Sequence, residues 1–208
     1  MNPYRTAKRV MDICISGAAL VLLSPVLAGV AAAIRLTSPG PAIYRGIRLG
    51  AAGRPFAMLK FRTMHVGAPD TRNVDGSTYS GDDDPRITRI GRLLRRTSLD
   101  ELPQLWNVLK GEMSLVGPRP ELPDQIRYYS EADRRRLQVQ PGITGLAQVS
   151  GRNALAWEQR RALDIQYVDS MNLRTDVLLL LRTIPGVLSA RGVFGARRDT
   201  PREPSRER

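Results

Sequence analysis

The sequence predicts a predominantly α-helical protein with a short β-hairpin, attached to a membrane through its N-terminal segment and through amphipathic helices. Three observations predict this class. An uncharged apolar run lies near the N-terminus, a Gly- and Pro-rich segment with short apolar runs follows it, and arginines then alternate with aliphatic residues at helical spacing. At 208 residues, 42% of them apolar, the chain suits a single domain with a substantial core.

The charge balance predicts an anionic partner. The 32 Lys and Arg against 20 acids give a net charge of +12, which suits a phosphorylated substrate, an anionic lipid or nucleic acid. Nucleic acid is disfavoured because aromatic residues make up only 5% of the chain and no recognition motif occurs. The single histidine, His65, argues against a zinc site, and the single Cys14 excludes a disulfide framework.

The apolar run from Ile13 to Ile34 contains 22 residues without a charge, or roughly 33 Å of helix, which is enough to cross the hydrocarbon core of a bilayer. A cleaved signal peptide is the alternative, because Lys8 and Arg9 form a basic start and the alanines at 31–33 resemble a cleavage site. However, the run is longer than a typical signal core and Arg35 follows it directly. A retained membrane segment is therefore favoured.

Ser24 and Pro25 interrupt the middle of this run. Proline removes a backbone donor and clashes with the preceding turn, and a neighbouring serine hydroxyl can bond to the carbonyl that is freed. Basic residues flank both ends of the run, so the positive-inside rule gives no orientation. These features favour a re-entrant helix–break–helix that enters one leaflet and returns. The alternative is an ordinary transmembrane helix with a kink.

After the membrane segment, residues 37–64 read as turns and short strands and predict a hairpin with its turn near Ala51–Arg54. Val66–Pro85 is polar and Gly-rich and predicts a loop. Its three acids, at 82–84, are interpreted as a solvated turn before a helix rather than as metal ligands.

A helix is expected from Pro85, with apolar residues recurring on one face at Ile87, Ile90, Leu93 and Leu94. Such a helix can lie in a membrane interface with its basic side among the headgroups, or it can cover a core. Much of the remaining surface is arginine: Arg86, Arg89, Arg92, Arg95 and Arg96.

This helix leads directly to two adjacent acids, Asp100 and Glu101. A capping box with Ser98 is the simplest interpretation of the pair. However, the chain also holds Arg119 between two prolines, and Arg152 ends a Gly-rich segment. Several loops thus present arginine and free N–H groups, which suits a diphosphate. No P-loop or dinucleotide fingerprint occurs, and we interpret the acid pair as a reaction centre.

Towards the C-terminus, residues 154–171 predict a helix with a polar face. Residues 177–190 are apolar but short and broken at Pro185, which favours packing or lying on the membrane over spanning it. We expect one domain at 1–193, comprising the membrane helix at 1–36 and a cytoplasmic catalytic part at 37–193. A disordered basic tail is expected at 194–208.

Over residues 5–193 the chain resembles the monotopic phosphoglycosyl transferases among the bacterial sugar transferases, particularly their small members. The resemblance rests on the order and spacing of "KRVMDICISGAALVLLSP", "SPGPAIYRGIRLG", "LKFRTM", "DPRITRIGRLLRRTSLDELPQLWNVLKGEMSLVGPRPE", "QPGITGLAQVSGRN" and "LDIQYV". One departure is the stretch Arg45–Ile47, which has no glutamine before Arg48. The sequence "SGRN" followed by a helix resembles the branch that uses UDP-linked N-acetylated amino sugars such as N,N′-diacetylbacillosamine.

The resemblance implies transfer of a sugar 1-phosphate from a UDP-sugar to undecaprenyl phosphate with release of UMP, in two steps through an aspartyl-phosphosugar. It also implies Mg²⁺, a re-entrant helix broken at Ser24-Pro25, and a position on the cytoplasmic face of the bacterial inner membrane. A homodimer is compatible with the sequence. The rival interpretation is a membrane-anchored protein without enzymatic activity that binds polyanions through its arginine faces.

The same resemblance assigns roles to particular side chains. Asp100 is expected to be the nucleophile and Glu101 its catalytic partner, with both acids as Mg²⁺ ligands. The side chains expected to contact phosphates or shape the site are Lys60, Arg62, Arg95, Arg119, Gln148 and Arg152.

Overall fold

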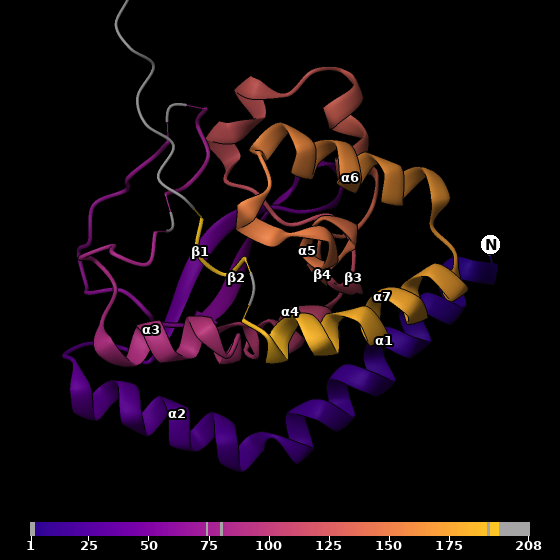
Figure 1. The fold of residues 1–208 in the computed structure, drawn as a ribbon. Helices are drawn as coiled ribbons and strands as arrows, with labels where there is room; N and C mark the ends of the chain where they lie inside the picture. The colour runs from indigo at the N-terminus through magenta and orange to yellow at the C-terminus, as the bar shows by residue number, and fades with distance from the viewer. Residues whose placement is uncertain (1–2, 74, 80, 191, 196–208) are drawn as a thin grey trace, which may run out of the picture.

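The computed structural model describes residues 3–73, 75–79, 81–190 and 192–195 (Figure 1). The helices are α1 (Pro3–Leu22), α2 (Ser24–Thr37), α3 (Arg89–Arg96), α4 (Gln104–Lys110), α5 (Leu146–Ser150), α6 (Trp157–Ser170) and α7 (Leu173–Leu188). The strands are β1 (Ile43–Leu49), β2 (Pro55–Phe61), β3 (Ser114–Val116) and β4 (Gly142–Thr144). The predicted class, mostly helical with a short hairpin, is confirmed. Most of the predicted tail, from 196 onward, lies outside the described residues.

Helices α1 and α2 form one bent pair, and the predicted break at Ser24-Pro25 is confirmed. The two axes differ by 62°. Pro25 cannot donate to the carbonyl of Val21 four residues before it, and the Ser24 hydroxyl donates to that carbonyl instead at 2.8 Å. Among the described helices, none is long and apolar enough to cross a membrane alone, whereas this bent pair passes that test when taken together.

The predicted hairpin is confirmed, and its turn is where the sequence places it. Strands β1 and β2 pair antiparallel from Ile43 opposite Phe61 to Leu49 opposite Pro55. A short 3-10 turn, η1 (Ala51–Gly53), joins them, with Ala52 at a positive φ of 55°. The described residues between 66 and 85 form a loop, as expected. Its acids differ in burial, however, because Asp84 is buried in an ion pair with Arg86, so the interpretation as a fully solvated turn is wrong for that residue.

A second sheet was not predicted. Strands β3 and β4 pair in parallel over three residues each, and they bring the loop after β3 against the segment that precedes β4. The backbones touch so closely that a Cβ atom on Gly142 would lie 2.1 Å from the amide nitrogen of Gly117. This contact fixes the "GPRP" loop beside the segment that leads into α5.

The main core lies between the hairpin, α4, β3, α6 and α7. It contains Met58, Leu105, Val108, Met113, Leu115, Val116, Tyr167 and Leu179. A second cluster joins Ile34 of α2 and Leu94 of α3 to Ala42 and Phe61. Since this cluster ties the end of α2 to the hairpin, the bent helix pair is anchored to the domain that follows it.

Helix α3 begins four residues later than the sequence predicts. Thr88 caps it by accepting a hydrogen bond from the amide of Gly91 at 2.9 Å, and Ile87 pairs with Met64 before the helix starts. Leu94 is buried, whereas Leu93 is 56% exposed. The predicted single apolar face is therefore divided between the core and the surface.

Helix α7 is continuous, so the predicted break at Pro185 is wrong. Asn172 caps its start by accepting a hydrogen bond from the amide of Thr175. Pro185 lies in the last turn, where its missing donor removes one hydrogen bond without ending the helix. The predicted helix at 154–171 is confirmed as α6.

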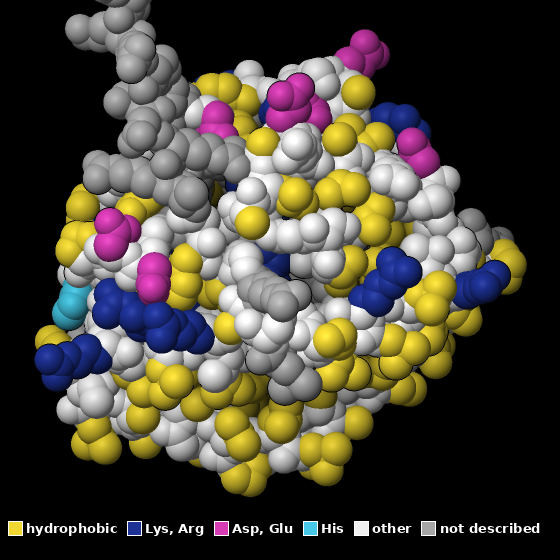
Figure 2. Space-filling model, in the orientation of Figure 1, with side chains coloured by type: hydrophobic (Ala, Val, Ile, Leu, Met, Phe, Trp, Pro, Cys, Tyr) yellow, Lys and Arg dark blue, Asp and Glu magenta, His cyan; other side chains and the backbone are white. Residues whose placement is uncertain are grey.

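Large apolar side chains are exposed along the outer helices. In Figure 1, α1 and α2 form one edge of the molecule, with α3, α4 and α7 in a layer directly above them. Figure 2 shows hydrophobic side chains gathered along this edge. The exposed residues of α1, α2 and α7 are Val10, Ile13, Ile15, Val21, Leu22, Val26, Leu36, Leu173, Val177, Leu178, Leu181 and Ile184. A soluble surface seldom carries so many of these residues together.

Candidate active site

A cavity of about 1300 Å³ opens between the hairpin, the acid pair, the "GPRP" loop and the segment from α5 to α6. Asp100 and Glu101 belong to a short 3-10 turn, η2 (Leu99–Glu101), between α3 and α4. Both acids line the cavity. The site therefore combines segments that are far apart in the sequence, and each of them comes from an element described above.

The acid pair does not cap a helix. Ser98 has a left-handed backbone, with φ of 56°, and its side chain caps nothing. Helix α4 begins only at Gln104, after Pro103. The capping-box interpretation is therefore wrong, because the side chain of Glu101 binds Lys60 and Arg119 and does not bond to the start of a helix. A positive φ at a serine is uncommon and strained, and such strain concentrates at functional sites.

Glu101 is held by two cations. Its Oε1 atom accepts hydrogen bonds from Nζ of Lys60 at 2.8 Å and from Nη2 of Arg119 at 2.7 Å. Burial disfavours the charged form, but the charges of Arg119 and Lys60 outweigh it and hold the pKa of Glu101 well below its usual range. Glu101 is therefore ionised and fixed, and it aligns the two cations beside Asp100.

Asp100 differs from its neighbour because it has no partner. The residue is only 7% exposed, yet within the described part of the chain its carboxylate accepts no hydrogen bond and forms no ion pair. Burial raises the pKa of Asp100 to about 6, against the opposing charge of Lys60. A buried carboxylate without a partner costs folding free energy, so its presence at a cavity wall indicates a function.

Four of the predicted cations surround the pair. Besides Lys60 and Arg119, Arg95 donates from Nε to the hydroxyl of Thr63 at 3.0 Å and Arg152 donates to the hydroxyl of Ser98 at 3.4 Å. Burial lowers the pKa of both arginines. Each guanidinium bonds only to an uncharged hydroxyl group, so its charge is not neutralised. Both arginines therefore remain available to an anion in the cavity.

Gln148 of α5 also lines the cavity. Its amide nitrogen and amide oxygen are both buried, and neither has a hydrogen-bond partner among the described residues. Buried amide groups are almost always paired, so an unpaired one at a cavity wall is expected to bind a ligand.

Arg62 is placed differently from the other predicted cations. Its guanidinium donates to the backbone carbonyls of residues 38–41, at distances from 2.6 to 3.3 Å. These bonds fix the turn between α2 and β1, which gives Arg62 a structural role in this conformation. The sequence does not reveal this role, because the carbonyls lie about twenty residues earlier in the chain.

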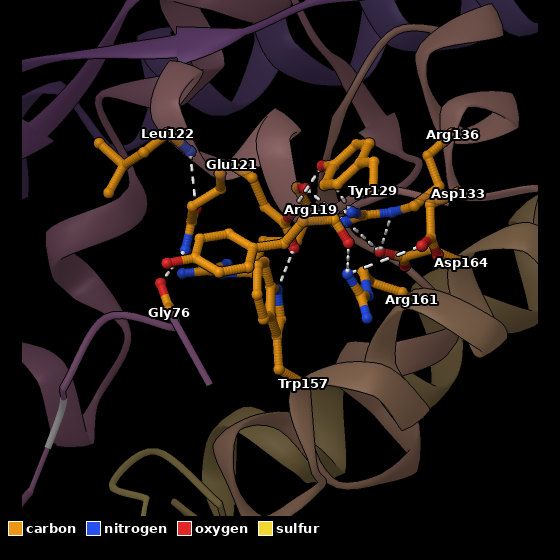
Figure 3. A network of polar contacts seen from close by, with 12 residues as sticks. Gly76, Arg119, Glu121, Leu122, Tyr129, Asp133, Arg136, Trp157, Arg161 and Asp164 are labelled. Atoms are coloured by element: carbon orange, nitrogen blue, oxygen red, sulfur yellow. Dashed lines mark hydrogen bonds and ion pairs between the residues drawn. The ribbon is translucent and has the colours of Figure 1, made fainter. Parts of the chain in front are cut away.

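A buried network next to the cavity was not predicted (Figure 3). Arg136 donates to Oδ2 of Asp164 at 2.6 Å and lies 2.9 Å from a carboxylate oxygen of Glu121. Glu121 also accepts hydrogen bonds from the indole of Trp157 and the hydroxyl of Tyr129. The "LDIQYV" motif contains Asp164, but nothing in the sequence pairs it with one arginine of the run at 134–136.

This network positions the "GPRP" loop. Arg136 donates a hydrogen bond to the backbone carbonyl of Arg119 at 3.1 Å. Leu49 at the end of β1 donates to the carbonyl of Glu121 at 2.9 Å. The backbone of Arg119 is thus held from two sides, and its guanidinium can bind Glu101 with little loss of entropy.

The donor set around the acid pair is small. No group of three or more His, Cys, Asp or Glu side chains that could hold a metal occurs in the described residues. Mg²⁺ commonly takes only one or two carboxylates and completes its shell with substrate phosphates and water. The unpaired carboxylate of Asp100 and the second oxygen of Glu101 fit that pattern.

Comparison with known proteins shows the family of the chain. Residues 3–190 match the bacterial sugar transferase family. The chain is 42% identical to the uncharacterized sugar transferase EpsL of Bacillus subtilis, covering 89% of each chain. It is 44% identical to the UDP-glucose:undecaprenyl-phosphate glucose-1-phosphate transferase of Caulobacter vibrioides, covering 90% of this chain and 72% of that one.

A protein of the same name in Escherichia coli is 41% identical over 86% of this chain, which spans 40% of that longer protein. A family match over nearly the whole chain, together with relatives at about 40% identity that it largely covers, leaves one conclusion. The chain is an enzyme that belongs to the bacterial sugar transferase family.

Proposed function

We propose that this enzyme transfers a sugar 1-phosphate from a UDP-sugar to undecaprenyl phosphate and releases UMP. The observation that carries the proposal is the unpaired, buried carboxylate of Asp100 at the wall of a cavity that is also lined by Lys60, Arg95, Arg119 and Arg152. A carboxylate that attacks phosphorus must be free of partners, and the charge of the phosphate must be neutralised. The names of two relatives, both undecaprenyl-phosphate glucose-1-phosphate transferases, support the substrate classes.

In the first step, a carboxylate oxygen of Asp100 attacks the phosphorus that bears the sugar. A P–O bond forms, the bond from that phosphorus to the UMP oxygen breaks, and UMP leaves with the electron pair. In the second step, a phosphate oxygen of undecaprenyl phosphate attacks the same phosphorus and the Asp100 carboxylate leaves. The product is undecaprenyl diphosphate carrying the sugar, and Asp100 is regenerated.

Lys60, Arg95 and Arg119 stabilise the charge that spreads over the phosphate oxygens in both steps. Arg152, which also lines the cavity and bonds to Ser98, binds the substrate anion beside them. Glu101 acts as a positioning residue, because a carboxylate that is so strongly stabilised in its charged form is a poor base. We further propose that Asp100 and Glu101 hold Mg²⁺ with the substrate phosphates, and the ion would neutralise the diphosphate charge.

We also propose that the α1–α2 pair dips into one leaflet of the cytoplasmic membrane and returns. The break at Pro25 and the exposed apolar side chains along α1, α2 and α7 support this placement. Cysteine labelling tests it in a Cys14→Ala background, with single cysteines replacing Arg5 and Arg54. In intact spheroplasts, an impermeant maleimide should label neither cysteine. Labelling of the Arg5→Cys variant alone would show that the pair spans the membrane.

The functional test is UMP release by the purified protein in lipid particles. The assay contains Mg²⁺, undecaprenyl phosphate and a panel of UDP-glucose, UDP-galactose and UDP-linked N-acetylated amino sugars. Wild type is compared with Asp100→Asn and with Glu158→Gln, which changes an exposed acid on α6. Release by wild type and by Glu158→Gln, but not by Asp100→Asn, is the expected result. Full release by Asp100→Asn would remove Asp100 as the nucleophile.

The same panel addresses the donor sugar. The amino-sugar branch suggested by "SGRN" stays a prediction, and a preference for UDP-glucose would contradict it. The non-enzymatic rival predicts binding of any polyanion, with an affinity that falls steeply as the salt concentration rises. Turnover of one UDP-sugar to UMP at physiological salt would exclude that rival.

A further inference from the structure

Arg48 is an arginine of the cavity wall without an acidic partner. It lies near the end of β1, and its one hydrogen bond in the described structure goes to the adjacent carbonyl of Ile47, at 2.9 Å. Burial lowers the pKa of Arg48, and the nearby charges of Arg119 and Arg72 lower it further. Asp70 lies within electrostatic reach but is bound to Arg72. A half-buried guanidinium at a cavity wall beside two others, with no acid bound to it among the described residues, can bind an anion from outside the chain.

A backbone hydrogen bond holds the segment that carries Arg48 next to the segment that carries Arg119. The amide of Leu49, next to Arg48, donates to the carbonyl of Glu121, two residues after Arg119. Arg119 in turn reaches Glu101, beside Asp100. Lys60 and Arg119 both bind Glu101, and Arg48 lies close enough to Arg119 for the two charges to interact. A diphosphate with its sugar-bearing phosphorus at Asp100 would place its other phosphate beside these cations.

Tyr44 lies on the same face of the hairpin. It pairs with Lys60 across the strands, and alternate residues of β1 point the same way, so Tyr44, Arg48 and Lys60 share one face. The Tyr44 ring lies over Gly46, where a Cβ atom would be only 2.7 Å from its Cε1 atom. The residue is 48% exposed and lines the cavity, and no ring or cation of the described residues stacks on it.

We infer that this face of β1 is the subsite for the nucleotide half of the donor. Arg48 binds the phosphate that leaves with the nucleoside, and the Tyr44 ring stacks on the pyrimidine base. A side chain at position 46 would displace the Tyr44 ring, because its Cβ atom would lie 2.7 Å from Cε1 of that ring. The inference rests on the proposed function for the existence of a pyrimidine nucleotide donor, and it assigns recognition of that donor to two residues outside the acid pair.

Isothermal titration of the full-length protein with UMP and with uridine tests this assignment. The variants are Arg48→Met, Tyr44→Leu and Tyr44→Phe. The matched control is Arg54→Met, which removes an exposed arginine from the turn of the same hairpin. Thermal unfolding of each variant identifies any loss of fold, and the KM for undecaprenyl phosphate is measured in parallel.

Arg48→Met should weaken UMP binding about tenfold to a hundredfold, since a charge-assisted contact is lost, while uridine binding stays within about twofold. Tyr44→Leu should weaken both ligands about fivefold or more, and Tyr44→Phe should bind both as wild type does. Arg54→Met should bind UMP unchanged. The KM for undecaprenyl phosphate should not change in Arg48→Met.

Three outcomes would overturn the inference. Unchanged UMP affinity in a folded Arg48→Met variant removes Arg48 from the nucleotide subsite. An unchanged UMP affinity with a raised KM for undecaprenyl phosphate would assign Arg48 to the acceptor phosphate instead. If wild type bound no UMP and released none from any UDP-sugar, the proposed function would fail as well, which separates that failure from the first two.

Discussion

Two neighbouring clusters of buried acids and arginines in this enzyme differ in one respect, which is whether their acids have partners. In the Glu121–Arg136–Asp164 network, Arg136 forms an ion pair with each carboxylate, and Glu121 also accepts hydrogen bonds from Trp157 and Tyr129 (Figure 3). In the cavity, Glu101 binds two cations, but Asp100 binds none of those in the described part of the chain. The first cluster holds a loop in place, and the second leaves one carboxylate free to react.

The difference shows which buried charges in such a protein are structural. A paired buried charge recovers its cost of desolvation through its partners, so its removal damages the fold. An unpaired one does not recover that cost, so its removal should spare the fold and damage the chemistry. Removal of a charge should therefore have opposite effects in the two clusters. The following experiments test this expectation, each in one of the clusters.

The largest effect is expected on turnover. Asp100→Asn keeps the size of the side chain and removes the nucleophile, so the rate of UMP release should fall at least about 10³-fold. The KM for the UDP-sugar should change much less. A rate within tenfold of wild type, measured in the same lipid particles, would place Asp100 with the structural acids.

The next largest effect is on stability in the paired network. Arg136→Met leaves the carboxylates of Asp164 and Glu121 buried without their shared cation, and the free energy of unfolding should fall by about 3–5 kcal/mol. Denaturant titration measures the change. The control is Arg135→Met, which breaks an exposed pair with Asp169 and should cost less than about 1 kcal/mol. Equal effects of the two substitutions would contradict the structural role of the network.

The pH dependence of stability isolates the contribution of Asp100 when wild type is compared with Asp100→Asn, because Asp164, whose pKa burial also raises to about 6, is present in both. Burial raises the pKa of Asp100 from 3.8 to about 6, so the folded state binds the proton more tightly than the unfolded state does. This contribution to stability is complete below about pH 4 and is lost as the pH rises through about 6. Asp100→Asn should therefore match wild type near pH 4 and exceed its stability by up to about 3 kcal/mol at pH 7.

This titration is performed without Mg²⁺, because a bound cation would lower the pKa of Asp100. Equal stability of wild type and Asp100→Asn at pH 7 would show that the carboxylate has a partner in solution. A less stable variant at pH 7 would contradict the comparison directly.

The smallest effect is expected at the neighbouring acid. Glu101→Gln keeps an acceptor for Lys60 and Arg119 but removes its charge, and kcat/KM should fall about tenfold to a hundredfold. The pair of cations would also lose its neutralising partner, so unlike Asp100→Asn this variant should be less stable than wild type. A variant that is inactive yet more stable would give Glu101 the properties assigned here to Asp100.

Local features of the fold were predictable from the sequence, and long-range ones were not. The break at Ser24-Pro25 and the hairpin turn near Ala51 follow from residues within four positions of each other, and both are confirmed. The capping box at Ser98 is also a local pattern, but it failed because Lys60 and Arg119 outcompete the helix for Glu101. The parallel pair β3–β4 has too few residues to show a period.

The candidate site shows the same division. The resemblance to the family singles out the acid pair and the surrounding cations. It did not predict that the guanidinium of Arg62 would donate its hydrogen bonds to the turn after α2. Arg136 is one of three consecutive arginines, and only tertiary contacts decide which of them is buried. The spacing of residues in the sequence does not show which side chains will form ion pairs in the tertiary structure. The sequence alone therefore could not distinguish the paired acids from the unpaired one.

The central claim is that Asp100 carries the sugar phosphate between the two steps, and mass spectrometry tests it most directly. The protein is mixed with Mg²⁺ and the UDP-sugar that supports UMP release, without undecaprenyl phosphate, and is quenched and digested with trypsin. The peptide Thr97–Lys110 should gain the mass of one sugar phosphate at Asp100 and lose it when undecaprenyl phosphate is added. Steady UMP release without this adduct, or an adduct on any other residue, would contradict the account.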